Sequence, residues 1–138
     1  MMQVLFLCTE NACRSQMAEG LVNHDLAGQV KAYSAGIRPS RVNPMAIQVM
    51  AELGIDISHH RSKSVDELAG QQFDLVITVC DQAQEQCPLF PGETEVIHVG
   101  FPDPARSSGS ERIFRKVRDA LREQLIPQLR DKFREKDR

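Results

Sequence analysis

The chain has 138 residues, of which 41% are hydrophobic and 26% are charged, and its formal net charge is -2. This length and apolar content are typical of one domain, spanning residues 1–138, with a single hydrophobic core. A net charge so close to zero excludes a general attraction to nucleic acid or to an acidic membrane surface. Any charged ligand must therefore be bound by local groups.

Four short β-rich segments alternate with helical segments along the chain. Their runs of Val, Ile, Leu and Phe are nearly continuous, as in strands that are covered on both faces. The alternation predicts an α/β fold. The predicted strands are Val4 to Leu7, Val30 to Ser34, Phe73 to Val79 and Glu95 to Val99.

The helical segments include a long amphipathic one at the C-terminus, with apolar residues about one turn apart. Pro127 is predicted to bend this helix or to end its first part. The segment 103–109, rich in Pro, Ser and Gly, is predicted to be a loop. The predicted helices are Arg14 to Leu26, Pro44 to Leu53 with Gly54 at its end, a short one after Cys80, and Ser110 to Phe133.

The first residues carry neither a basic leader nor an apolar run long enough for a signal peptide or a membrane span. We therefore expect a cytoplasmic protein. Structural disulfides are rare in that reducing compartment, so the cysteines must serve packing, metal binding or redox chemistry. There are four of them, at Cys8, Cys13, Cys80 and Cys87.

A C-x5-R-S motif follows the first predicted strand and opens the first predicted helix. A loop that curls into a helix N-terminus points successive backbone N–H groups at one spot, where the helix dipole adds positive charge. This arrangement predicts a site for a tetrahedral oxyanion, closed by the two-pronged guanidinium of the arginine. The motif consists of Cys8, Thr9, Glu10, Asn11, Ala12, Cys13, Arg14 and Ser15.

Cys8 is predicted to be the nucleophile at the centre of this loop. The positive field should lower its pKa from about 8.5 to roughly 3.5 to 7.5. Ser15 can donate a hydroxyl hydrogen bond to the thiolate, and Asn11 tolerates the left-handed backbone of a tight loop. A single cysteine at a strand end is more often a buried packing residue, but Arg14 and the strand-helix context argue against that alternative here.

The motif resembles the low-molecular-weight protein tyrosine phosphatases, and the resemblance covers essentially the whole chain. It implies a single three-layer domain with a four-stranded parallel sheet flanked by helices. It also implies that Asp103, in Asp103-Pro104, is the general acid for the leaving oxygen. Taken alone, an Asp-Pro pair would indicate only a turn.

The further thiols in Cys80-x6-Cys87, together with the first motif, resemble the thioredoxin-coupled arsenate reductases built on the same fold. The resemblance implies that Cys8, Cys80 and Cys87 reduce arsenate to arsenite, that thioredoxin regenerates them, and that no cofactor is used. Ala105 and Arg106 stand where related tyrosine phosphatases have aromatic residues, which favours a small inorganic substrate. We expect a monomer with weak phosphatase side activity.

Three cysteines suit this chemistry because two thiols that form one disulfide supply the two electrons that arsenate takes up. Cys8 would bind arsenic, Cys80 would attack the Cys8 sulfur, and Cys87 would move the disulfide outward. If residues 80 to 87 formed a helix, the two Cα atoms would lie about 10 Å apart. A disulfide needs less than about 7 Å, so this polar segment must unwind during turnover.

Some reductases of this type hold potassium beneath the anion loop. The residues that resemble that site are Asn11, Glu19 and Ser34, but Lys63 stands where those enzymes have an oxygen ligand. We expect the Lys63 ammonium to occupy the place of the ion. Among the histidines, His60 resembles a family position close to the loop.

Three other functions compete with the reductase. A phosphatase of the same fold would use the extra cysteines only to protect its nucleophile. A non-catalytic oxyanion or redox sensor would have no use for Asp103 as an acid. A zinc site is disfavoured because the spacings C-x4-C and C-x6-C differ from C-x2-C knuckles, so we predict no metal site.

Overall fold

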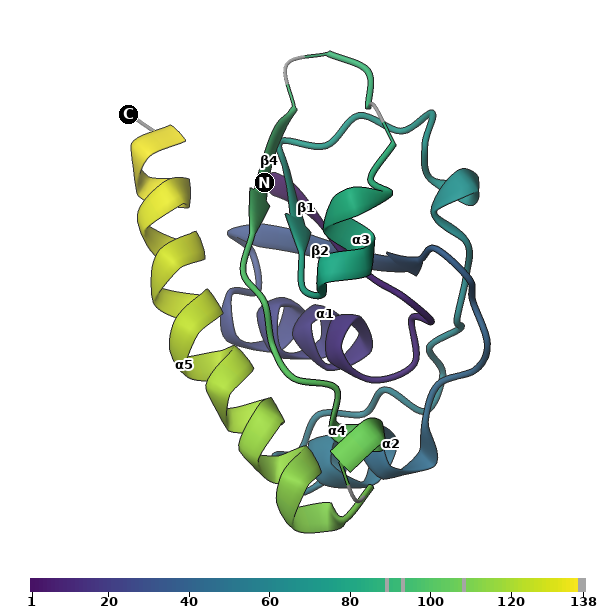
Figure 1. Cartoon of the computed structure of the whole chain (residues 1–138). Helices are drawn as coiled ribbons and strands as arrows, with labels where there is room; N and C mark the ends of the chain where they lie inside the picture. Colours follow the sequence, from purple (N-terminus) through teal and green to yellow (C-terminus); the bar gives the residue numbers. More distant parts are fainter. Residues whose placement is uncertain (89, 93, 108, 137–138) are drawn as a thin grey trace.

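The computed structural model describes residues 1–88, 90–92, 94–107 and 109–136 (Figure 1). It contains one sheet of four parallel strands in the order β2-β1-β3-β4. The α/β fold is confirmed, and all four predicted strands are present with slightly different bounds. The strands are β1 (Met2–Cys8), β2 (Val30–Gly36), β3 (Leu75–Thr78) and β4 (Glu95–His98).

The central strand β1 is covered on both faces, which explains its unbroken apolar sequence. Successive side chains of a strand point to opposite faces, and all four of the residues from Val4 to Leu7 are fully buried. Edge strand β4 differs from the prediction, because Val96 is 48% exposed. Two layers of helices and loops therefore enclose the middle of the sheet, while β4 is partly open to solvent.

Helices follow each strand and complete the layers. Both α1 and α2 pack against the long α5, while α3 contacts β1 and β3. No helix within the described segments is long and apolar enough to cross a bilayer. The helices are α1 (Arg14–Asp25), α2 (Pro44–Ala51), the short 3-10 helix η1 (Val65–Glu67), α3 (Asp81–Glu85), α4 (Pro104–Ser107) and α5 (Glu111–Lys136).

Helix α5 continues through the proline that was predicted to bend it or to end its first part. Pro127 lies inside the helix, so the expected ending is wrong. The predicted apolar face is buried, and Ile126 and Leu129 anchor the helix on both sides of the proline. Burial of this face compensates for the backbone hydrogen bond that Pro127 cannot donate.

The predicted loop 103–109 contains the short helix α4, which is a further correction. Asp103 Oδ1 accepts a hydrogen bond from Ala105 N at 3.0 Å, as a capping residue does, and Pro104 fits the first helical position. Helix α2 ends at Ala51, earlier than predicted, and Gly54 adopts the left-handed conformation (φ 76°) just beyond it.

The parallel register brings the functional segments to one edge of the sheet. Cys8 pairs with Gly36, Leu7 with Thr78, and Thr78 with His98. The carboxyl ends of all four strands therefore lie side by side. Open parallel sheets bind ligands at that edge, and the C-x5-R-S loop begins there.

Candidate active site

The anion loop, defined as residues 8–15, connects the end of β1 to the start of α1. Among the described residues, Asn11 is the one non-glycine residue with a positive φ, at 53°, as predicted for a tight loop. Cys13 occupies the N-cap of α1 and makes no side-chain capping hydrogen bond in the described structure. The first N–H groups of α1 are thus left without a capping side chain.

The segment after β2 holds the anion loop through its carbonyl groups. The backbone N–H groups of Ile37, Arg38, Ser40 and Asn43 donate to the carbonyls of residues 8, 9, 10 and 12, at 2.8 to 3.1 Å. With the carbonyls engaged on that side, the loop N–H groups turn toward the opposite side. The predicted oxyanion cradle therefore has a physical basis in the main chain.

Gly36 makes this close approach of two backbones possible. A Cβ atom at Gly36 would lie 2.9 Å from both Asn11 N and Thr9 O, which is closer than side chains tolerate. Any larger residue would push the anion loop away from β2.

The sulfur of Cys8 lies among donors at the base of the loop. Asn11 N donates to Cys8 Sγ at 3.2 Å, and Ser15 Oγ lies 2.8 Å from the same sulfur. Asn11 Nδ2 donates to Ser15 Oγ at 2.7 Å. The Ser15 hydroxyl is thereby free to direct its own proton to the sulfur, as predicted for a residue that stabilises a thiolate.

The predicted low pKa of Cys8 is not found. Burial raises the pKa of the Cys8 thiol above its ordinary value, because the side chain is only 2% exposed. Hydrogen bonds from Ser15 and Asn11 and the charge of Arg14 act in the opposite direction but do not outweigh burial. The sequence reveals the neighbouring donors, whereas the depth of the sulfur depends on the complete fold.

Arg14 and Asp103 face each other across the entrance to the loop. Arg14 Nη2 lies 3.8 Å from Asp103 Oδ2, and Arg14 Nη1 donates to Phe101 O at 3.0 Å. Asp103 is anchored by Ala105 N, and Arg106 Nε lies 3.8 Å from the same carboxylate. The predicted arginine and the predicted general acid are therefore brought together although they are distant in sequence.

Cys80 lies at the same entrance and Cys87 lies further out. Cys80 is buried at the N-cap of α3, and its Sγ lies 3.2 Å from the hydroxyl of Thr9. Cys87 is half-buried beyond the C-terminus of α3, and burial raises the pKa of its thiol. The four cysteines are unpaired thiols in this structure. The Thr9–Cys80 contact had no signal in the sequence.

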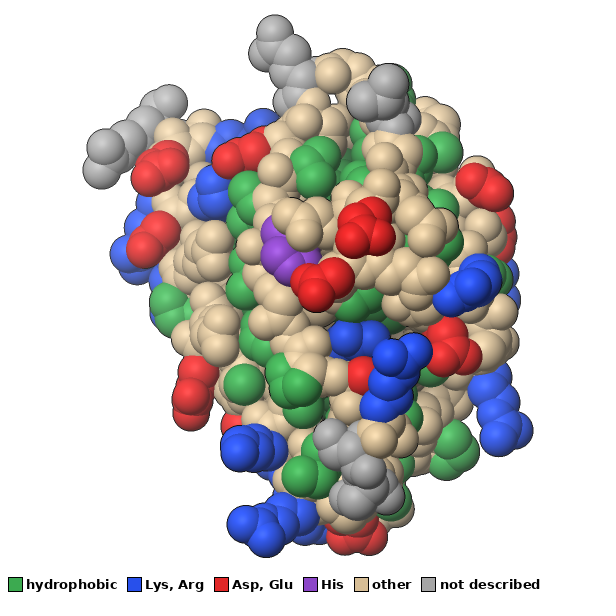
Figure 2. Space-filling model, in the orientation of Figure 1, with side chains coloured by type: hydrophobic (Ala, Val, Ile, Leu, Met, Phe, Trp, Pro, Cys, Tyr) green, Lys and Arg blue, Asp and Glu red, His purple; other side chains and the backbone are tan. Residues whose placement is uncertain are grey.

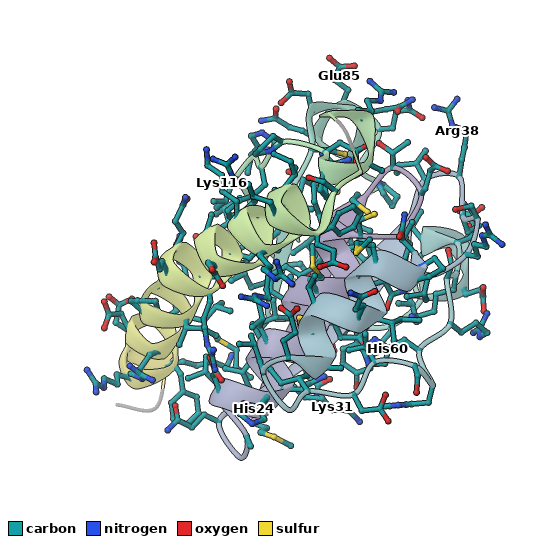
Figure 3. The ribbon with its side chains drawn as sticks, turned by 90° about the horizontal axis from the view of Figure 1, so that it is seen from below. His24, Lys31, Arg38, His60, Glu85 and Lys116 are labelled. Carbon is teal, nitrogen blue, oxygen red and sulfur yellow. The ribbon has the colours of Figure 1, made fainter. Side chains whose placement is uncertain are left out.

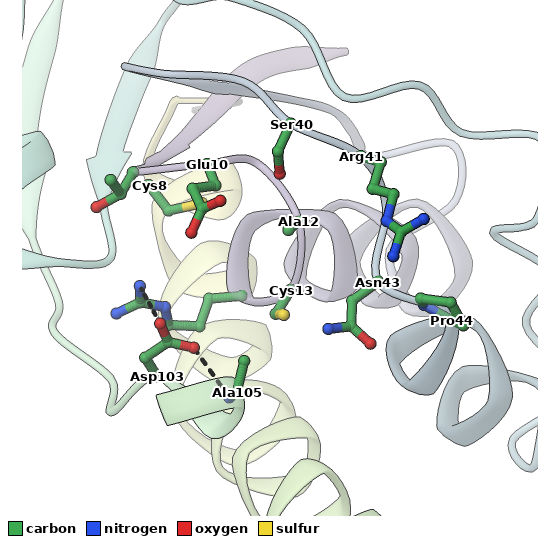
Figure 4. A pocket seen from close by; sticks show the side chains of 12 residues that line it. Cys8, Glu10, Ala12, Cys13, Ser40, Arg41, Asn43, Pro44, Asp103 and Ala105 are labelled. Carbon is green, nitrogen blue, oxygen red and sulfur yellow. Dashed lines mark hydrogen bonds and ion pairs between the residues drawn. The ribbon is translucent and has the colours of Figure 1, made fainter. Parts of the chain in front are cut away.

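Two cavities of about 500 Å³ and 580 Å³ meet at the anion loop. Cys8, Cys13 and Arg41 line the first cavity, which Figure 4 shows, whereas Cys80 and Arg106 line the second. Four residues of the entrance line both cavities: Thr9, Glu10, Arg14 and Asp103. An anion bound in the loop would thus be reachable from the side of Cys80.

This geometry agrees with what comparison with known proteins finds. A family model described as low molecular weight phosphotyrosine protein phosphatase matches residues 3–138. The chain belongs to this family. Within it, an arsenate reductase from Halalkalibacterium halodurans is 45% identical over 122 residues, which cover 86% of this chain and 88% of the relative.

Solved structures point to the same branch of the family. One described as an arsenate reductase in the oxidized state has a TM-score of 0.81 at 32% identity, and the match covers 95% of this chain and 98% of that chain. A thioredoxin-dependent arsenate reductase from Corynebacterium glutamicum has a TM-score of 0.71 at 29% identity, over 94% of this chain and 62% of that chain.

A polar cluster supports the anion loop of this family member from below. Ser34 Oγ donates to Glu19 Oε1 at 2.7 Å, and His60 Nε2 lies 3.4 Å from Glu19 Oε2. Lys63 N donates to Asn11 Oδ1 at 3.0 Å, while Lys63 Nζ donates to Arg61 O at 3.3 Å. The residues predicted for a cation site therefore lie together.

The charge of Lys63 interacts electrostatically with the carboxylate of Glu19 in that cluster. Burial lowers the pKa of Lys63, and the carboxylate of Glu19 opposes this shift. No group of three or more His, Cys, Asp or Glu side chains in the described part of the chain is arranged to hold a metal ion. The ammonium of Lys63 contacts Arg61 O and interacts with Glu19 only through the electrostatic field.

Gln16 connects this cluster to the anion loop, a role that sequence analysis missed. Its Nε2 donates to Asn11 Oδ1 at 2.9 Å, and its Oε1 lies 2.9 Å from His60 Nδ1. Gln16 is fully buried in the first turn of α1. A polar residue on the buried face of a helix is the signal that could have indicated this contact.

Proposed function

We propose that this chain, an arsenate reductase, reduces arsenate through the thiols of Cys8, Cys80 and Cys87 and is regenerated by thioredoxin. The observation that carries this proposal is the contact between Thr9 and Cys80, which places a second thiol at the entrance to the anion loop. A phosphatase needs one thiol, an arginine and an acid for its reaction, so Cys80 and Cys87 would have no part in its catalysis and could only protect the nucleophile.

In the first step the Cys8 sulfur attacks arsenic while the loop N–H groups and Arg14 bind the oxygens. The S–As bond forms, one As–O bond breaks, and the departing oxygen leaves as water. Asp103, which lies 3.8 Å from Arg14, would deliver a proton to that oxygen. The thiol proton of Cys8 replaces the proton that Asp103 delivers. With the two protons of dihydrogen arsenate the step is then balanced and yields a thiol ester and water.

In the second step Cys80 attacks the Cys8 sulfur. An S–S bond forms and the S–As bond breaks, so the electron pair of that bond goes to arsenic. Arsenic is reduced from the pentavalent to the trivalent state and leaves as arsenite. Cys8 and Cys80 are oxidised to a disulfide, and the proton of the Cys80 thiol leaves with arsenite.

In the third step Cys87 attacks the Cys80 sulfur, so that Cys8 leaves as the free thiol. The disulfide then joins Cys80 and Cys87 at the two ends of α3. Cys87 is half-buried, whereas Cys8 is almost completely buried, which supports transfer of the disulfide to a place that a protein reductant can reach. Thioredoxin would then reduce this disulfide and complete the cycle.

A coupled assay tests the proposal. The purified chain is mixed with arsenate, thioredoxin, thioredoxin reductase and NADPH, and NADPH oxidation is followed by absorbance. We expect oxidation that requires arsenate, thioredoxin and the chain together. Hydrolysis of an aryl phosphate without arsenate-dependent NADPH oxidation would identify a phosphatase instead, which is the alternative favoured by the shared loop and Asp103.

A further inference from the structure

Glu10 places a carboxylate at the entrance to the anion loop. Its side chain is exposed and lines both cavities, together with Thr9, Arg14 and Asp103. Figure 4 draws it among the side chains around the first cavity, close to Cys8. Neither the thiol relay nor the proton delivery proposed above uses this carboxylate, although it lines both cavities that lead to the loop.

The position of Glu10 is set by its main chain and not by its side chain. Its carbonyl accepts hydrogen bonds from Ser40 N at 3.1 Å and from Ser62 Oγ at 2.9 Å. Its φ is not positive, unlike that of Asn11, so other residues fit the same backbone. The side chain can therefore be exchanged while the loop keeps its conformation.

The entrance carries little excess positive charge. The second cavity is lined by two arginines, Arg14 and Arg106, against the three carboxylates of Glu10, Asp81 and Asp103. In the first cavity Arg14 and Arg41 face Glu10 and Asp103. Acidic and basic side chains are likewise interspersed over the face shown in Figure 2. Each additional negative charge on a ligand is therefore poorly compensated.

The field of Glu10 also reaches the interior of the loop. Burial is the main reason why the pKa of Cys13 rises to about 12, and the negative charges of Asp103 and Glu10 raise it further. A second negative group held inside the loop experiences the same repulsion.

We propose that Glu10 is a specificity-determining residue that makes the anion loop prefer singly charged over doubly charged oxyanions. Coulomb energy is proportional to the product of the two charges, so the carboxylate opposes a dianion twice as strongly as a monoanion. The inference rests on the proposed function, because the arsenate monoanion is the form that balances the first step with release of water. Doubly charged competitors such as sulfate would bind more weakly.

Anion binding, which requires no arsenate reduction, tests this inference. Isothermal titration calorimetry at low ionic strength compares sulfate, a dianion, with phosphate slightly below neutral pH, where the monoanion prevails. Replacing Glu10→Gln should tighten phosphate binding by about threefold and sulfate binding by about tenfold, close to the square of the first factor. Glu10→Lys should tighten the binding of both anions further, and that of sulfate more than that of phosphate.

The matched control is Glu123→Gln, which removes the same charge from an exposed position on α5 that lines neither cavity. It should leave both affinities unchanged. Equal factors for sulfate and phosphate in Glu10→Gln, or no change in either, would overturn the inference. Circular dichroism of each variant verifies that it is folded. The two proposals can fail separately. If the chain did not reduce arsenate but the affinities for sulfate and phosphate changed as expected, the proposed function would be wrong and the charge preference would be supported.

Discussion

Cys80 and Cys87 are separated by one short helix and have different surroundings. Cys80 is buried against Thr9, whereas Cys87 is half-buried in the segment after α3. In the proposed relay the first would attack inside the site and the second would exchange with a partner outside it. Variants that remove each thiol separately can distinguish these two roles.

The variant Cys87→Ser should release one arsenite per chain and then stop, because Cys80 can still attack the Cys8 sulfur. Peptide mapping should find a disulfide between Cys8 and Cys80. The measurement is a single-turnover assay of arsenite without reductant. Cys80→Ser is the comparison, and it should fail to produce even this first equivalent efficiently.

Rapid multiple turnovers of Cys87→Ser with thioredoxin would contradict the relay and leave Cys87 as a bystander. The expected result is slow recovery, since Cys8 as a residue is only 2% exposed and a protein reductant would reach its sulfur poorly.

Lys63 should make the enzyme insensitive to potassium, because its backbone N–H binds Asn11 Oδ1 and its ammonium interacts electrostatically with Glu19. Exchange of potassium for another monovalent cation at fixed ionic strength should leave KM for arsenate unchanged. The Lys63→Ala variant is expected to have a higher KM, since positive charge is lost below the loop.

A severalfold, potassium-specific decrease of KM in the unaltered chain would show that an ion binds there and that Lys63 does not replace it. Restoration of the Lys63→Ala variant by potassium alone would support the replacement.

At the scale of elements, α3 is a short helix whose described residues make few side-chain contacts. It has five residues, of which Ala83 is buried. Two exposed contacts fasten it: His98 Nε2 lies 3.2 Å from Asp81 Oδ1, and Arg38 Nη2 donates to Gln82 Oε1 at 3.1 Å. Arg38 itself projects from the surface in Figure 3. So few contacts are consistent with the unwinding that a Cys80–Cys87 disulfide requires.

Helix α5 offers a direct test of what its internal proline costs. Replacing Pro127, an exposed residue, by alanine restores a backbone N–H and removes the steric conflict with the preceding turn. We expect Pro127→Ala to raise the free energy of unfolding by about 1 to 3 kcal/mol, measured by urea denaturation. The matched control Gln124→Ala should change it by less than about 0.5 kcal/mol. An unchanged or lower stability of Pro127→Ala would mean that the helix is adapted to its proline.

The elements with a strong local signal were predicted, apart from α4, whereas the order of the strands was not. The strand before Cys8, the anion loop and α1 follow from an apolar run and the C-x5-R-S spacing. Helix α4 had a readable local signal, because Asp103 caps it and Pro104 occupies its first position. The order of the strands, in contrast, depends on pairing between segments far apart in the chain.

The site shows the same division. Positions that the motif or the family resemblance indicated lie at the site, but the contact of Thr9 with Cys80 joins residues 71 positions apart. The burial that raises the pKa of Cys8 depends on the packing of several elements. Local sequence reveals which groups are present and gives no measure of how far water is excluded from them.

At the scale of the whole molecule, acid should weaken the fold at His60 before it weakens the carboxylates. Burial lowers the pKa of His60 below its ordinary 6.5, with Glu19 acting in the opposite direction. The unfolded chain therefore binds a proton at a higher pH than the folded chain does. The stability that neutral His60 contributes is present above about pH 6.5 and is lost as the pH falls through its lower folded pKa.

Urea denaturation at a series of pH values can measure this loss, with His60→Gln as the comparison. The unaltered chain should lose stability as the pH falls below 6.5, and the variant should lose less in that interval. Carboxylates such as Glu52, whose pKa the neighbouring Arg115 lowers to about 2, contribute losses only in stronger acid. Parallel curves for the two proteins between neutrality and mild acid would contradict the assignment to His60.

The hydrogen bonds that the loop carbonyls accept also allow ligand binding in the loop to be followed by NMR spectroscopy. The amide protons of residues 9–13 belong to the loop that we propose to bind the oxyanion, whereas those of Ile37, Arg38, Ser40 and Asn43 are already engaged by loop carbonyls. In an amide NMR spectrum the first set would shift when the ligand enters, while the second would serve as an internal reference. Occupancy could thus be followed with unlabelled anions.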